Sequence, residues 1–188
     1  MSRWVLPTSA VIGGVEYKLH ADFRDVLNII SHLQNQEDTP QERIYIALAL
    51  FYEGFDAMPR SDHQEAADYL MQFINCGEPE ADTGPHPKRI DWEQDAGHIV
   101  SGVNKVAGAE IRSLPFLHWW TFIAFFSAVG EGTLATVVSI RDKRRKGKKL
   151  DDWERDFYQE NRDMVDFRHK YTAEELEERE RLRKLIDG

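Results

Sequence analysis

Hydrophobic and polar residues first alternate along this chain and then recur with a helical period. Segments 11–12 and 15–19 flank Gly13 and Gly14, a pair that suits a tight turn with positive φ. We therefore predict an N-terminal β-hairpin. From Asp22 onward the apolar residues recur at steps of three and four, which predicts an amphipathic helix. Its apolar positions are Phe23, Val26, Leu27, Ile30 and Leu33.

Capping signals place the next two helices. Residues 39–42 read Thr-Pro-Gln-Glu, a capping box with proline in the first turn, and this predicts a helix that runs to about Gly54. Ser61 or Asp62 can cap a third helix, which should end near Gly77. The apolar positions of this third helix include Ala67, Leu70, Met71 and Ile74.

An irregular loop separates these helices from the next three. Residues 77–89 contain three prolines and two glycines, so the segment either divides two subdomains or joins two helices of one bundle. Asp91 can cap a fourth helix, with Glu93 and Asp95 near its positive end. The apolar face of that helix would hold Trp92, Ala96, Ile99, Val100, Val103 and Val106.

Residues 114–129 form the least polar stretch of the chain and predict a fifth helix. Sixteen residues that include His118 fall short of the roughly 20 that a membrane-spanning helix needs. A helix that is apolar on nearly all sides should lie at the centre of a core, with Phe116 on its main face. His118 and the indole N–H groups would need acceptors, for which Asp91, Glu93 and Asp95 are the candidates. Residues 133–146 predict a sixth helix.

The C-terminal part of the chain is dominated by charge. Residues 141–149 carry seven basic side chains, and another helix should start at about Asp151. Its spacing favours a buried stripe that docks on the domain or on another subunit, made of Trp153, Phe157, Met164, Phe167 and Tyr171. A capping box at 172–175 opens a last helix, which is either a solvated arm or a surface for a partner. Its sparse apolar residues are Leu176, Leu182, Leu185 and Ile186.

These elements predict a mainly α fold, a multi-helix bundle with a small N-terminal β-hairpin and a charged C-terminal helical extension. We expect a core domain over residues 1–149, with the irregular loop at 77–89, and an extension over residues 150–188. The chain has 188 residues, a formal net charge of -9 and a single cysteine. The charge disfavours nucleic-acid binding, and a lone cysteine excludes an intramolecular disulfide. No continuous signal-peptide core is present at the N-terminus, so an intracellular setting is expected.

Candidate chemistry is sparse. Glu93, Asp95, His98 and His118 are the best available metal ligands, but acids at a helix start and a histidine at the core edge account for them better. Cys76 lies at a helix end with no catalytic neighbourhood, which indicates an unreactive thiol. We therefore predict no catalytic residue, no metal and no cofactor. The basic run 141–149 is favoured as a solvated helix end, with a protein-binding patch and then nucleic acid as the alternatives.

Two sequence blocks carry a family resemblance. The first is GVEYKLHADFR, residues 14–24, and the second starts at DWEQDAGH, residues 91–98, and continues through LHWWTFIAFF to VVSIRDKR at Arg144. Together they resemble the bacteriophage gene-product-fifteen family over roughly residues 11–145. The residues that carry this signature are Asp22, Phe23, Arg24, Asp91, Trp92, His118, Trp119 and Trp120.

The resemblance implies a protein encoded among siphophage or prophage tail genes, near those for the tail tube and the tape measure. It implies a non-enzymatic tail assembly chaperone that binds the tape-measure protein or other tail proteins in the host bacterial cytoplasm. A homo-oligomer is possible; membrane and nucleic-acid partners are not expected. The alternatives are a minor structural component of the mature tail and a metal-assisted enzyme. We place the partner surface in the charged C-terminal part, at Arg141, Arg144, Arg145, Leu176, Leu182, Leu185 and Ile186.

Overall fold

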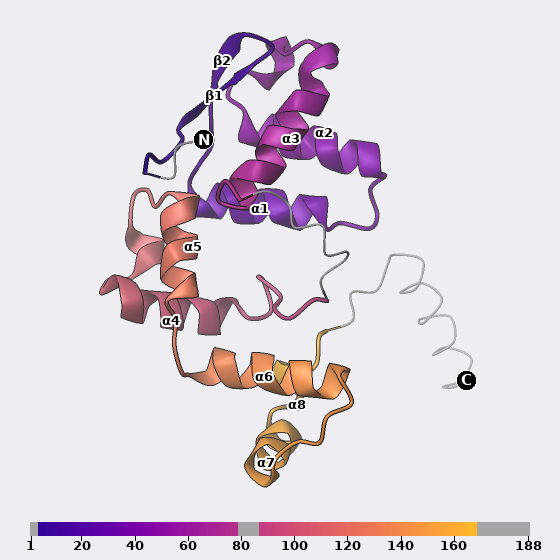
Figure 1. Ribbon diagram of the computed structural model, residues 1–188, viewed down its shortest axis with the longest axis vertical. Coiled ribbons are helices and arrows are strands. Elements are labelled where there is room, and N and C mark those ends of the chain that lie inside the picture. Colours follow the sequence, from indigo (N-terminus) through magenta and orange to yellow (C-terminus); the bar gives the residue numbers. More distant parts are fainter. Residues whose placement is uncertain (1–3, 79–86, 169–188) are drawn as a thin grey trace, which may run out of the picture. The chain divides into compact units, whose positions relative to one another are not determined.

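The computed structural model describes residues 4–78 and 87–168 and shows a mainly α protein (Figure 1). In this described part, eight α-helices accompany one two-stranded antiparallel sheet, which confirms the predicted fold class. The chain divides into two compact units, residues 1–135 and residues 136–188. The final predicted helix, with Leu176, Leu182, Leu185 and Ile186, lies outside the described residues, and so does Tyr171.

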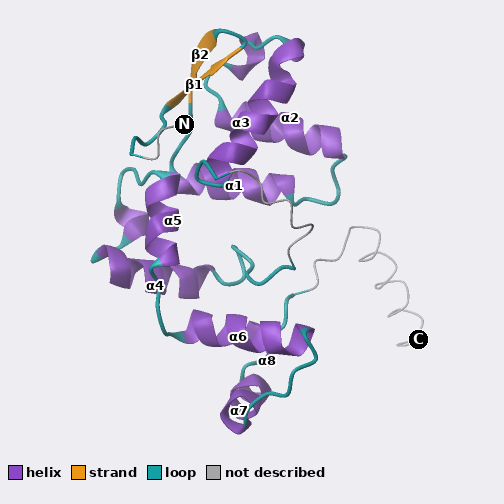
Figure 2. Cartoon of the chain, in the orientation of Figure 1, coloured by secondary structure: helices purple, strands orange, loops and turns teal. Residues whose placement is uncertain are grey.

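The N-terminal hairpin forms as predicted (Figure 2). Strands β1 (Ser9–Ile12) and β2 (Val15–Lys18) pair in register around a turn in which Gly13 and Gly14 have φ values of 57° and 82°. Residues with a β-carbon rarely adopt such φ angles, so the Gly-Gly pair explains the turn. One face of the hairpin is buried and consists of Ala10, Ile12 and Tyr17.

Three helices follow the hairpin in unit 1: α1 (Phe23–Leu33), α2 (Pro40–Phe51) and α3 (His63–Ile74). Helix α3 contacts β1, and α2 contacts both α1 and α3. The capping box at the start of α2 is present, as predicted. Helix α2 ends at Phe51, earlier than the predicted Gly54. The reason is that Tyr52 turns into a β-bridge with Leu19 and its hydroxyl donates a 2.9 Å hydrogen bond to the Ala66 carbonyl. Short 3-10 turns, η1 (Phe55–Ala57) and η2 (Arg60–Asp62), lead into α3.

The buried face of α3 differs from the predicted one. Met71 is exposed, whereas Phe73 is completely buried against Phe51, with ring centroids 4.9 Å apart. The four apolar positions chosen from the sequence included Met71 because its spacing from Ala67 is helical. Ala67 and Leu70 are buried as predicted, and Ala66 and Phe73 complete the buried face.

Helix α4 (Ala96–Ala107) begins four residues later than expected, with Asp95 instead of Asp91 at the N-cap position. The Asp91 carboxylate does accept backbone N–H bonds, from Glu93 (3.0 Å) and Gln94 (2.8 Å), but it closes a turn rather than a helix. Such side-chain bonds compete with helix formation. Two residues assigned to the apolar face, Ala96 and Val106, are exposed, while Ile99 and Val103 are buried as predicted.

Helix α5 (Trp119–Ser127) covers only part of the apolar stretch 114–129, from which a helix starting after Pro115 was predicted. It follows the turn η3 (Ile111–Ser113) and an extended segment that leaves the Phe116 side chain 53% exposed. Placing Phe116 on the main face of a central helix was therefore wrong. The buried residues of α5 are Trp119, Trp120 and Phe122. No helix in the described ranges is long and apolar enough to cross a membrane.

Helix α6 (Thr133–Arg145) matches its prediction, and from Thr136 onward it belongs to unit 2 with α7 (Asp152–Glu160) and α8 (Arg162–Val165). The division into units falls inside α6, and the buried face of α6 packs on the segment that follows it. The core of unit 2 consists of Val137, Ile140 and Val165, with Leu150, Phe157, Tyr158 and Met164 against it.

The predicted stripe on α7 is wrong at its first residue. Trp153 is 58% exposed, and the neighbouring Glu154 is buried instead. Its carboxylate accepts the Asp151 backbone N–H at 2.9 Å and pairs with Lys143 Nζ at 2.6 Å. A buried charge with these partners is satisfied, so the helix can turn its glutamate inward and its tryptophan outward.

Candidate functional site

The two family-like blocks meet in the middle of unit 1. Asp22 and His118 form an antiparallel β-bridge, in which Phe23 N–H donates to the Leu117 carbonyl (2.9 Å) and Trp119 N–H donates to the Ala21 carbonyl (2.8 Å). Figure 1 shows the start of α5 beside the start of α1, consistent with this bridge. We call residues 21–24 and 117–120 the junction.

Asp22 is the charged centre of the junction and is only 7% exposed. Its carboxylate accepts the backbone N–H of Leu117 at 2.9 Å and that of Arg24 at 3.0 Å, and so caps α1. It also accepts two bonds from the Arg24 guanidinium, Nε at 2.6 Å and Nη2 at 2.9 Å. Burial alone would raise the pKa of Asp22, but these bonds outweigh it and the pKa is lowered. Asp22 is thus a fixed anion with a structural task.

His118 has both ring nitrogens occupied. Nδ1 accepts the Trp120 backbone N–H at 3.1 Å, which caps α5, and Nε2 lies 3.0 Å from the Pro7 carbonyl oxygen. A carbonyl can only accept, so Nε2 carries the proton and the ring is neutral. Burial lowers the pKa of His118, while the bond to Pro7 opposes that shift. The neutral ring therefore joins the N-terminal segment to the start of α5.

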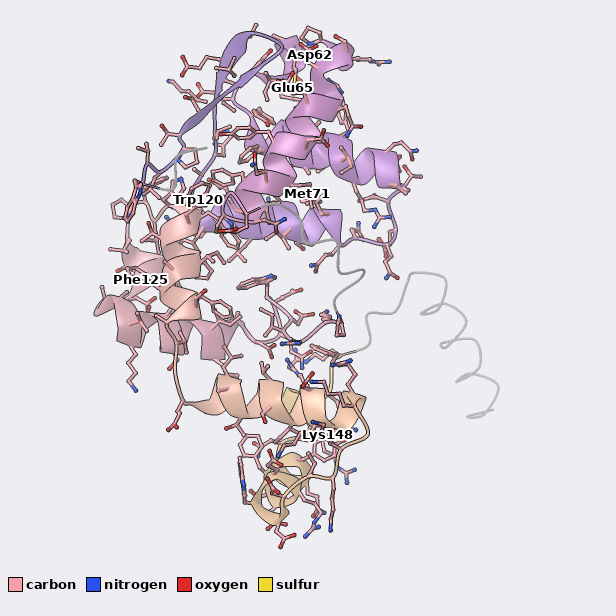
Figure 3. All side chains as sticks on the ribbon, viewed as in Figure 1. Asp62, Glu65, Met71, Trp120, Phe125 and Lys148 are labelled. Atoms are coloured by element: carbon pink, nitrogen blue, oxygen red, sulfur yellow. The ribbon has the colours of Figure 1, made fainter. Side chains whose placement is uncertain are left out.

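The two indoles of the junction bind the end of α3. Trp119 Nε1 donates to the Ile74 carbonyl and Trp120 Nε1 donates to the Phe73 carbonyl, each at 2.9 Å. Carbonyls in the last turn of a helix have no partner within the helix, so the indoles satisfy them. We predicted Asp91, Glu93 and Asp95 as the acceptors for the indole N–H groups and for His118, and this prediction was wrong. Figure 3 labels Trp120 at the start of α5.

Trp92 and Asp91 extend this packed region. The Trp92 ring contacts Trp119, Phe122 and Phe126, with centroids 6.0, 6.2 and 5.3 Å away. Asp91 pairs with Lys88 Nζ at 2.7 Å; burial raises its pKa, but the bonds from Gln94 and Lys88 outweigh this and lower it to about 2. All eight signature residues therefore serve packing, capping or ion pairing.

The candidate metal ligands are engaged in the same way. Asp95 is 1% exposed and its carboxylate accepts the Asp91 backbone N–H at 2.9 Å. His118 is held at both nitrogens, as described above. Over residues 4–78 and 87–168, no group of three or more histidine, cysteine, aspartate or glutamate side chains is arranged to hold a metal ion. Glu93, Asp95, His98 and His118 are therefore not brought together as a ligand set.

Arg141, the first residue of the predicted partner patch, lies inside unit 2 and is 7% exposed. Its Nε donates to the Val165 carbonyl at 2.6 Å and its Nη2 to the Met164 carbonyl at 2.9 Å, at the end of α8. The guanidinium also lies over the Phe167 ring, 4.1 Å from its centroid. Arg141 thus connects α6 to the end of α8 within unit 2. This differs from the exposed contact with a partner protein that we expected.

Other basic residues of the run 141–149 also have partners within unit 2. Arg144 pairs with Asp166 and lies over the Tyr158 ring, with its guanidinium carbon 4.1 Å from the centroid. Arg145 pairs with Asp142 at 2.8 Å. Lys143 pairs with Glu154 and Asp151, and Lys146 pairs with Asp142. A phosphate backbone would have to displace these carboxylates, which further disfavours nucleic acid as the partner of this run.

Two surface features of unit 1 were missed in reading the sequence. One is an open depression of about 500 Å³ along α3, lined by Glu65, Asp68, Tyr69, Met71, Gln72, Asn75 and Glu78. Figure 3 labels two of its residues, Glu65 and Met71. The other is a group of exposed apolar side chains, Trp4, Val5, Leu6 and Phe116. The run Trp-Val-Leu before Pro7 was the available signal for this second feature.

Comparison with known proteins identifies the family. The family model described as Bacteriophage Gp15 protein matches residues 5–167. The chain belongs to the Bacteriophage Gp15 protein family. The match spans both blocks that carried the resemblance and confirms it. No curated protein matched the chain, and no solved structure did. In this Gp15-family protein, six of the eight signature residues lie in the junction, and Asp91 and Trp92 lie in the segment before α4.

Proposed function

We propose that this Gp15-family protein is a non-enzymatic tail assembly protein, a chaperone that binds the tape-measure protein or other tail subunits in the host cytoplasm during virion morphogenesis. The family match over residues 5–167 carries the proposal. A tape-measure protein is a very long helical chain, and its apolar faces are open to aggregation until the tail tube surrounds them. A reversible binding partner keeps such faces covered.

The physical character of unit 1 supports this role. Residues 1–135 contain 19 acidic and 9 basic side chains, so the unit carries a strong negative charge that favours solubility. Exposed apolar side chains on the same unit can contact the apolar face of a partner. The ionisable groups of the junction are held by hydrogen bonds with structural tasks, which favours a binding protein over an enzyme.

Co-expression tests the proposal. The tape-measure protein from the same phage should be insoluble or aggregated when expressed alone and should be recovered as a soluble complex with this chain. An unrelated long coiled-coil protein is the control and should not co-purify. If the tape-measure protein is equally soluble alone, and the two proteins migrate separately in size-exclusion chromatography, the chaperone role is wrong.

Mass spectrometry of purified virions separates the chaperone from the structural alternative. An assembly factor should be absent from mature particles or present well below one copy per tail. A fixed number of copies per particle would make this protein a minor structural component of the tail.

A further inference from the structure

The most exposed apolar side chains of unit 1 include three that are consecutive in the sequence. Trp4 is 97% exposed, Val5 64% and Leu6 47%, and Phe116, from the segment before α5, is 53% exposed. We call these four residues the apolar patch. Water contact with so much tryptophan and phenylalanine surface is unfavourable, so exposed groups of this kind commonly mark binding sites.

His118 brings the two segments of the patch together. The Pro7 carbonyl, directly after Leu6, lies 3.0 Å from His118 Nε2, and the Phe116 ring centroid is 6.4 Å from that of His118. Both neighbours of Phe116 are also held: the Pro115 carbonyl accepts from Arg24 Nη2 at 3.3 Å, and Leu117 N–H donates to Asp22. The backbone on both sides of Phe116 is therefore fixed by hydrogen bonds while its ring faces solvent.

The size of the patch limits what can cover it. An aromatic side chain contributes about 150–250 Å² when fully buried, so the four exposed fractions amount to roughly 500 Å². A stable dimer needs about 800 Å² from each partner. A second copy of this chain is thus a poor fit, whereas a few anchoring side chains on one face of an amphipathic helix match the area.

The charges beside Phe116 are neutralised in pairs. Arg24 Nε binds the Asp22 carboxylate at 2.6 Å, and Arg112 Nε binds that of Glu110 at 2.8 Å. Such pairs provide little attraction for a strongly charged peptide. Recognition at this place therefore depends on apolar contact.

We propose that the apolar patch is the surface through which this protein binds the apolar face of an amphipathic helix in a tail protein. The inference rests on the proposed function for the identity of the partner. It moves the expected contact from the C-terminal basic run to the N-terminal segment. Trp4 and Phe116 provide most of the area and are the expected anchors.

Binding of synthetic peptides tests the patch. Overlapping peptides that cover the predicted helices of the tape-measure protein are titrated against the full chain by isothermal calorimetry. The double variant Trp4→Ser with Phe116→Ser should weaken the tightest peptide by about 30-fold or more, as expected for anchor residues. Trp153→Ser is the matched control, because Trp153 is also an exposed tryptophan but lies in unit 2, and it should leave the affinity unchanged.

Each outcome decides the inference. All of these side chains are exposed, so circular dichroism and urea curves of the variants should match those of the parent. An unchanged affinity of the double variant, or an equal loss in Trp153→Ser, overturns the assignment. A concentration-dependent dimer that the double variant abolishes in sedimentation would show that a second copy covers the patch, which also overturns it. If the parent complex forms and the double variant retains it, only this inference fails; if no parent complex forms, the proposed function fails too.

Discussion

Replacing Asp22 by alanine removes the anion on which the junction is built. In the folded protein its carboxylate accepts the Leu117 backbone N–H at 2.9 Å and the Arg24 backbone N–H at 3.0 Å. Alanine can accept neither bond. The Leu117 N–H would remain buried without an acceptor, and α1 would lose its N-terminal cap.

Two contributions set the expected loss of stability. Losing an N-cap side chain costs about 1 kcal/mol. A buried N–H left without a partner costs about 1–3 kcal/mol more. We add nothing for the Arg24 ion pair, because that guanidinium is at the surface and is screened by solvent. The free energy of unfolding should therefore fall by roughly 2–4 kcal/mol, which for a domain of this size lowers Tm by about 5–15 °C.

Urea unfolding followed by tryptophan fluorescence measures this loss. Trp92, Trp119 and Trp120 report on unit 1, and a Trp153→Phe background removes the tryptophan of unit 2. Asp25→Ala is the matched control, since Asp25 is an exposed aspartate in the first turn of the same helix. Its effect should stay within about 0.5 kcal/mol. Equal effects of the Asp22 and Asp25 variants would refute the account of the junction given above.

Three further outcomes follow from the same structure. Burial lowers the pKa of His118 below its usual 6.5, so the neutral ring contributes its full stabilisation above pH 6.5, and the stability of the protein should fall as the pH drops below that value. His118→Asn keeps an acceptor for the cap of α5 and should flatten this part of a profile of Tm against pH. Arg141→Met leaves two carbonyls of α8 without their donor and should lower the free energy of unfolding of unit 2, measured in urea, by about 2–4 kcal/mol, with Arg145→Met near neutral as the comparison. Burial raises the pKa of the Cys76 thiol to about 11, so labelling by a maleimide at pH 7.5 should be slow in the folded protein and fast in urea, and equal rates would contradict the burial.

Much of the secondary structure was predictable because it depends on residues close in sequence. The hairpin turn needs positive φ at two positions, and Gly13 with Gly14 supplies it. The capping box of α2 joins Thr39 to Glu42 within a single turn. The period of apolar residues located α1, and the capping signals located α2 and α3, to within a few residues. Family membership was also recognisable, since it depends on the order of short motifs.

The errors arose where a side-chain hydrogen bond, which the apolar pattern does not show, decides the local structure. Asp91 was expected to start a helix. Instead it closes a turn in which the Asp95 carboxylate accepts a hydrogen bond from the Asp91 backbone N–H. Arg141 was expected at the surface, but the α8 carbonyls and Phe167 draw it inside. The partners of Arg141 lie 23 and 24 residues away along the chain, so its neighbours in the sequence do not show them.

The candidate site shows the same division. The sequence by itself determined which residues are unusual: Asp22, His118, Trp119 and Trp120 stood out by type and position. Only the tertiary structure decided what they do, because their hydrogen bonds reach the backbone of Pro7, α3 and each other's segments. The spacing of residues along the chain determines the period and the caps of a helix or strand. Which group accepts a hydrogen bond from a buried donor, and which apolar side chain stays exposed, depends on the segments that the folded chain brings together.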